Sequence, residues 1–84
     1  MNNFNETLRE KAMLNDTISI SVEADNFSLD FSMKVFDFYV QDDFYFLEDE
    51  NDNLFQFRVD EYEYDYDANT YIIKSDGMTI QLMM

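Results

Sequence analysis

Apolar residues recur along the chain first with the period of a helix and then with the period of a strand. Between residues 4 and 14 they fall at every fourth position, at Phe4, Leu8 and Ala12. This spacing predicts one short helix, with Asn3 as its N-cap and Asn15-Asp16 at its end. Because a helix of this length is marginal alone, we expect its apolar stripe to dock on the rest of the protein.

From Thr17 to the end, apolar and polar residues alternate with the period of two that is typical of β-strands. The alternation changes phase within residues 27–40, near Met33, and again near Asp60 in the segment that begins at Leu54. No turn residue lies at Met33, so a bulge in one long strand is favoured over two strands. Asp76-Gly77, between two alternating runs, predicts a hairpin.

These elements predict the α+β class in a single domain of residues 1–84. The expected architecture is one short N-terminal helix, about residues 4–14, packed on a bent antiparallel sheet of about five or six strands, about residues 17–84, in a meander. The chain shows no composition shift typical of a linker, and no internal repeat.

Composition and charge exclude several classes of protein. With no Cys and no His, the chain cannot form a disulfide scaffold, a Cys/His zinc site or a thiol active site. A net charge of −14 repels phosphate and argues against direct nucleic-acid binding. The content of 46% hydrophobic and 18% aromatic residues argues against disorder. We expect a cytoplasmic protein without a membrane partner, because neither a signal sequence nor a long apolar run is present.

Catalytic and metal-binding chemistry finds little support in the sequence. The usual nucleophile–base pairs need His or Cys, so we expect no enzyme, no catalytic residue and no cofactor. Residues 49–60 resemble a calcium-binding loop in the spacing of Asp49, Asn51, Asn53 and Asp60. Leu54 replaces the glycine that such a loop needs, and the flanking segments favour strands, so we expect no metal site.

The negative charge is concentrated in one part of the chain. Residues 37–67 hold twelve acidic residues and one basic residue, Arg58, for a net charge of −11. Solubility alone does not require this, because a net charge of about 2–8 suffices for a small domain. Clustered like charges destabilise the folded state, so we expect an external cationic partner to compensate them.

Within this acidic block, acidic residues alternate with tyrosines from residue 61 to residue 67. On one strand these acidic side chains would project from a single face about 6.6–6.8 Å apart, with the tyrosines on the reverse face. Two neighbouring acidic loops and two tyrosines, as interface anchors, complete the expected partner-binding set. The set is Asp42, Asp43, Tyr45, Glu48, Asp49, Glu50, Asp52, Glu61, Glu63, Tyr64, Asp65 and Asp67.

In size, charge and lack of catalytic residues, the chain resembles small acidic phage proteins of the anti-CRISPR and DNA-mimic type. The points of likeness are Asp42-Asp43, residues 48–52 and residues 61–67. The resemblance implies an inhibitor in the cytoplasm of an infected bacterium. Such an inhibitor would occupy the basic groove of a nucleic-acid-binding enzyme, with a Cas nuclease as the leading candidate partner.

Two other functions stay open from the sequence. An immunity protein or antitoxin that neutralises a basic toxin would need the same surface chemistry. A structural or assembly module would instead use the fifteen Phe and Tyr residues to form a homo-oligomer. The chain is therefore expected to be a monomer or a homodimer.

Overall fold

The single helix, α1 (Phe4–Leu14), has the predicted bounds. The computed structural model describes residues 4–84, so the predicted cap Asn3 lies outside the described residues. Phe4 and Leu8 are buried. At the C-terminal end of α1, Asn15 adopts a left-handed φ of 52°. Its N–H donates to Ala12 O at 3.2 Å, and that of Asp16 donates to Lys11 O at 2.9 Å, the pattern that ends a helix in a Schellman motif.

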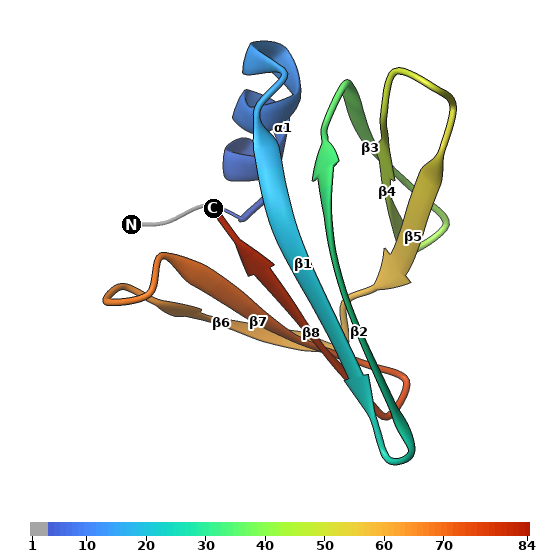
Figure 1. The fold of residues 1–84 in the computed structure, drawn as a ribbon, viewed down its shortest axis with the longest axis vertical. Coiled ribbons are helices and arrows are strands. Elements are labelled where there is room, and N and C mark those ends of the chain that lie inside the picture. The colour runs from blue at the N-terminus through green and yellow to red at the C-terminus, as the bar shows by residue number, and fades with distance from the viewer. Residues whose placement is uncertain (1–3) are drawn as a thin grey trace.

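Antiparallel strands form the rest of the described chain, and the α+β class is confirmed (Figure 1). The larger sheet has the order β2-β1-β8-β7-β6 and the smaller sheet the order β3-β4-β5. The larger sheet contains β1 (Thr17–Ala24), β2 (Phe27–Lys34), β6 (Glu61–Asp65), β7 (Thr70–Ser75) and β8 (Met78–Met83). The smaller sheet contains β3 (Asp37–Gln41), β4 (Phe44–Glu48) and β5 (Leu54–Arg58).

The structure has eight strands in two sheets where the sequence pattern indicated five or six in one bent sheet. The difference arises where the phase of the alternation changes. The Val35 N–H donates to Asp16 O at 2.9 Å, beside the larger sheet, whereas the next N–H, of Phe36, donates to Glu48 O at 2.8 Å in the smaller sheet. Residues 27–40 therefore form two strands, because consecutive backbone groups pair with different sheets.

The chain returns to the larger sheet between β5 and β6 in the same way. Arg58 still pairs with Phe44 of β4, but the Asp60 N–H donates to Lys74 O of β7 at 2.9 Å. Figure 1 shows β3, β4 and β5 as a separate group at the upper right, beside the five-stranded sheet. The larger sheet also departs from a meander, because β1 pairs with β8 from the other end of the chain.

The predicted β7–β8 hairpin is confirmed. Ser75 pairs with Met78, and the two residues between them have left-handed φ values, 48° at Asp76 and 78° at Gly77. Two consecutive residues with positive φ are typical of a type I′ turn, whose twist matches that of the flanking strands. The single glycine of the chain therefore serves this turn.

The core lies between the two sheets and beneath α1. Its fully buried members include Leu47 of the smaller sheet and Ile20, Tyr71, Ile73 and Leu82 of the larger sheet. Phe4 of α1 joins the two sheets, because its ring lies 5.5 Å from Tyr45 of β4 and 4.8 Å from Tyr71 of β7. Over residues 4–84 no helix is long and apolar enough to cross a membrane.

Candidate functional site

The alternating acidic residues begin as predicted, on one face of the edge strand β6. Register pairs Glu61 with Lys74 and Glu63 with Ile72 of β7, so Glu61, Glu63 and Asp65 project from the outer face of the larger sheet. All three are exposed. Charged side chains on an edge strand also prevent edge-to-edge pairing, which is a structural reason for charge at this place.

The row of acidic residues on β6 is shorter than predicted. β6 ends at Asp65, whose Oδ1 accepts the N–H groups of Asp67 at 3.0 Å and Ala68 at 3.2 Å. This side chain starts a turn, so Asp67 and Tyr66 leave the strand and Tyr66 is 74% exposed. Tyr66, predicted on the reverse face of the strand, therefore lies in the turn after it, where its ring meets that of Tyr64 edge-on at 4.6 Å.

The other two tyrosines of β6 do support the strand from its inner side. The Tyr62 ring stacks on Phe4 at 5.1 Å, and the Tyr64 ring lies 4.8 Å from Tyr71. Tyr64 also donates a hydrogen bond to Asn69 Oδ1 in the following turn. The Tyr64 ring therefore packs against the core and its hydroxyl binds the turn, so little of this side chain is available to contact a partner.

The first acidic loop is the tight turn between β3 and β4. Asp42 and Asp43 adopt left-handed φ values of 53° and 68°, and both side chains are exposed. Gln41 pairs with Phe44, so these two residues form the whole connection. Left-handed backbone is one that Asp and Asn tolerate better than most residues. The turn therefore presents two adjacent carboxylates to solvent.

The second acidic loop, between β4 and β5, is organised by Asp49. Its Oδ1 accepts the N–H groups of Asn51 and Asn53, each at 2.9 Å, and its Oδ2 accepts Asn53 Nδ2 at 3.0 Å. The Asn53 side-chain hydrogen bond, followed by the two backbone N–H groups, holds the pKa of Asp49 below its ordinary value. Glu50 and Asp52, on the same loop, are exposed.

The same hydrogen bonds bear on the spacing that resembles a calcium loop. Both oxygens of Asp49 accept hydrogen bonds from their own loop, and the flanking elements are the strands β4 and β5. Within the described part of the chain, no three acidic residues gather closely enough to hold a metal ion. The shape of the loop is therefore explained by its own hydrogen bonds.

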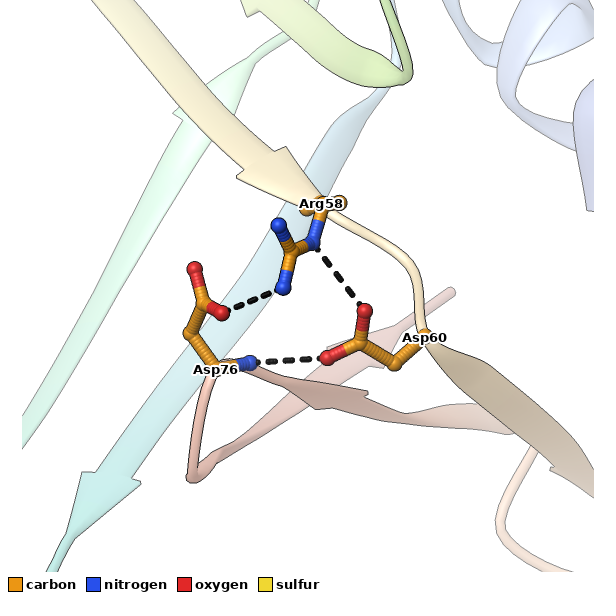
Figure 2. A network of polar contacts seen from close by, with 3 residues as sticks. All are labelled: Arg58, Asp60 and Asp76. Atoms are coloured by element: carbon orange, nitrogen blue, oxygen red, sulfur yellow. Dashed lines mark hydrogen bonds and ion pairs between the residues drawn. The ribbon is translucent and has the colours of Figure 1, made fainter.

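Arg58, the one basic residue of the acidic block, is used inside the fold. Figure 2 shows its guanidinium between two carboxylates at the junction of the sheets. Nε donates to Asp60 Oδ1 at 3.0 Å and Nη2 donates to Asp76 Oδ1, while the Asp76 N–H donates to Asp60 Oδ2 at 3.0 Å. The network ties the end of β5 to the β7–β8 turn. The Asp76 N–H, and secondly Arg58, lower the pKa of Asp60.

The predicted partner-binding residues fall into two separate regions. The residues from 42 to 52 lie on the smaller sheet and its loops, whereas those from 61 to 67 lie on β6 and the turn after it. In Figure 1 the β6–β7 turn lies at the far left and the β4–β5 loop at the upper right. The acidic loops therefore do not extend the row on β6, and each region must be considered as a surface of its own.

Tyr45 lies on the inner face of β4, where it is partly buried. Its ring is 5.6 Å from that of Phe57 and 5.5 Å from that of Phe4, both of them buried. It packs against the core cluster. Like Tyr64, Tyr45 uses its aromatic ring for contacts within the fold.

Sequence reasoning missed an aromatic group on the opposite, outer face of the smaller sheet. Register places Tyr39 of β3 beside Phe46 of β4, and their rings stack at 4.8 Å with an interplanar angle of 13°. Phe44 lies two residues before Phe46 on the same face. All three are partly exposed. The signal was present in Phe44-Tyr45-Phe46-Leu47, where bulky residues occupy both faces of a strand.

Acidic residues border this aromatic group. Asp37 and Glu48 are paired in register next to the Tyr39–Phe46 pair, and the Tyr39 hydroxyl donates to Glu48 Oε1 at 3.4 Å. Desolvation, with a further contribution from the charge of Glu48, raises the pKa of Tyr39. The Asp42-Asp43 turn lies at the other end of the same strands. We call Tyr39, Phe44 and Phe46, with Asp37, Glu48, Asp42 and Asp43 around them, the aromatic face.

Comparison of the chain with protein-family models, with curated proteins and with solved structures gives no significant match.

Proposed function

We propose that this protein is a non-enzymatic inhibitor that binds a cationic, nucleic-acid-binding protein through its acidic surface. The observation that carries the proposal is the net charge of −11 in residues 37–67. In a domain of this size such a concentration of like charge costs folding stability, so it is best explained by an external cationic partner.

The contacts within the fold support this proposal, because they leave much of the charge uncompensated. In the ion pairs formed between two residues of the described range 4–84, the cations are Lys11 and Arg58. Several acidic side chains of the block are exposed and make neither a hydrogen bond nor an ion pair to the rest of the described chain. These are Asp42, Asp43, Glu50, Asp52, Glu61, Glu63 and Asp67.

The mechanism would be competition for a basic groove. Lysine and arginine side chains that normally contact phosphates would contact carboxylates instead, and the bound inhibitor would exclude DNA or RNA. The resemblance to anti-CRISPR proteins makes a Cas nuclease in the bacterial cytoplasm the leading candidate for the partner. An immunity protein against a basic nuclease would act by the same chemistry.

The first experiment is affinity capture from bacterial lysate at low salt, followed by elution at high salt. We expect a nucleic-acid-binding protein in the eluate, and we expect the purified inhibitor to displace labelled DNA from it in a mobility-shift assay. An eluate without any nucleic-acid-binding protein, or a captured protein that keeps its DNA when saturated with inhibitor, contradicts the proposal.

Charge variants with a matched control locate the contact. The test variant is Glu61→Gln, Glu63→Gln, Asp65→Asn and Asp67→Asn; the control, outside the block, is Glu10→Gln, Glu23→Gln, Asp25→Asn and Asp30→Asn. Both change the net charge by the same amount, and all eight side chains are exposed. We expect the test variant to lose more affinity than the control. Equal losses would mean that only the total charge matters and that the β6 row is not a contact.

A further inference from the structure

We propose that the aromatic face of the β3-β4-β5 sheet is a docking surface for an arginine-rich segment of the partner. The proposal rests on the proposed function for the cationic nature of the partner. It adds a binding site on the smaller sheet and names the side chain that the site would recognise.

Both faces of the β3-β4-β5 sheet carry large apolar side chains, but only one face is covered. On the inner face Phe38, Leu47 and Phe57 are 7%, 0% and 3% exposed. Their neighbours Tyr39 and Phe46 alternate with them on the outer face, where they remain partly exposed. A fold with a small core does not need aromatic residues on its solvent side.

The strand register places the outer side chains of this sheet in an ordered grid. Across the outer face, Asp37, Glu48 and Leu54 form one row and Tyr39, Phe46 and Gln56 form the next. Gln41, Phe44 and Arg58 form the third row. Phe46 is thus the central position of the face. A central aromatic residue with a polar rim is the usual arrangement of a strong protein–protein contact.

The charge around the aromatic residues decides which kind of partner the face would bind. Asp37 and Glu48 lie at one side of the Tyr39–Phe46 stack, and the Asp42-Asp43 turn lies beyond the other. The one cation on the face, Arg58, is already bound by Asp60 and Asp76. The face therefore offers aromatic surface and carboxylates together, which complements a cationic side chain and repels an anionic one.

Arginine fits this combination better than lysine. Its planar guanidinium can stack on an aromatic ring while its N–H groups donate to a neighbouring carboxylate, whereas the lysine ammonium is a compact and strongly hydrated charge. A second copy of this chain is a poor occupant, because it would bring another charge of −14 against the acidic rim.

The test uses nona-arginine and nona-lysine peptides as probes in a ¹⁵N-HSQC titration of the full chain at about 0.15 M salt. We expect the shift changes to centre on β3 and β4 and the arginine peptide to bind more tightly than the lysine peptide. Phe46→Thr should weaken arginine-peptide binding at least about tenfold, as for a central interface residue. The control is Leu29→Thr, which removes an apolar side chain that is 52% exposed on the other sheet.

The outcomes separate this inference from the proposed function. If shift changes centre on β6, if Phe46→Thr binds the peptide as tightly as the wild type, or if neither peptide binds, the docking surface is wrong. In the first two cases capture of a nucleic-acid-binding protein by the wild type would still support the proposed function. A dimer in sedimentation velocity that Phe46→Thr dissociates would assign the face to a second copy and would also overturn the inference.

Discussion

Two adjacent residues of β4 should differ sharply in what their truncation costs. Leu47 is 0% exposed and sits at the middle of the inner face, between Phe38 and Phe55 in register. Phe46 lies on the outer face, where its contact is the stack with Tyr39. The two substitutions, Leu47→Ala and Phe46→Ala, share the loss of strand propensity in going to alanine, so their difference reports on burial.

The expected magnitudes follow from these contacts. Leu47→Ala removes buried methyl groups and leaves a cavity, which costs about 2–5 kcal/mol of unfolding free energy. Phe46→Ala loses an aromatic pair at a partly exposed site, for which about 0.5–1.5 kcal/mol is typical. In a small domain, whose whole stability is about 5–15 kcal/mol, the first loss is severe and the second is tolerable.

Urea unfolding followed by tyrosine fluorescence and circular dichroism measures both values, with the slope checked for two-state behaviour. Truncation of the larger residue, Phe46, should thus lower the unfolding free energy less than truncation of its smaller neighbour, Leu47. If Phe46→Ala destabilises the protein as much as Leu47→Ala does, Phe46 is a core residue and the reasoning that leaves the aromatic face free for a partner fails.

Three further predictions test the rest of the fold. Phe4→Ala should cost about 3–5 kcal/mol in urea unfolding, because the ring joins both sheets, and a cost under about 1 kcal/mol would refute that role. Gly77→Ala should cost about 1–2 kcal/mol through its φ of 78°, with Gly77→Asn milder, and an equal cost for both would point to a cause other than φ. The NMR titration of Asp60 should give a pKa below its ordinary value, raised in part by Arg58→Gln, whereas no change in that variant would contradict the network. The pKa of Asp60 is lower in the folded state than in the unfolded state. The ionised Asp60 therefore stabilises the fold in full above about pH 4, the unfolded pKa, and this contribution is lost as the pH falls through the folded pKa.

The helix and the β7–β8 hairpin were predictable because their signals are local. Phe4 and Leu8 mark one helical stripe, Asn15-Asp16 supplies the helix end, and Asp76-Gly77 supplies a turn that needs positive φ. Each of these depends on residues close together in the chain. The phase changes near Met33 and Asp60 were also visible, and they mark the places where the chain passes from one sheet to the other.

Neighbouring residues alone could not show whether such a phase change is a bulge within one strand or the start of another strand. Whether Val35 and Phe36 continue one strand or start another depends on which carbonyls accept their N–H groups. Those carbonyls belong to Asp16 and Glu48, at distant positions in the chain. The pairing of β1 with β8 is likewise a long-range choice that alternation does not encode.

The candidate surface was predicted in part for the same reason. The acidic row was readable on β6 because alternation along a strand is local, but its end at Asp65 depends on a side-chain turn. Tyr45 and Tyr64 were expected at the surface because tyrosine is typical of interfaces, and only the packing against Phe57 and Tyr71 shows that their rings are used within the fold. The outer position of Phe46 depends on which face of β4 the core covers.

The central claim is that the excess charge of residues 37–67 serves an external partner and not the fold. The most direct test is the unfolding free energy at low salt of a variant that neutralises the exposed acidic residues without an ion pair: Asp42→Asn, Asp43→Asn, Glu50→Gln, Asp52→Asn, Glu61→Gln, Glu63→Gln and Asp67→Asn. Asparagine suits the left-handed backbone of Asp42, Asp43 and Asp52. We predict that the variant is more stable than the wild type, because like-charge repulsion is relieved. A variant that is less stable would show that the fold itself requires these charges, and would contradict the account.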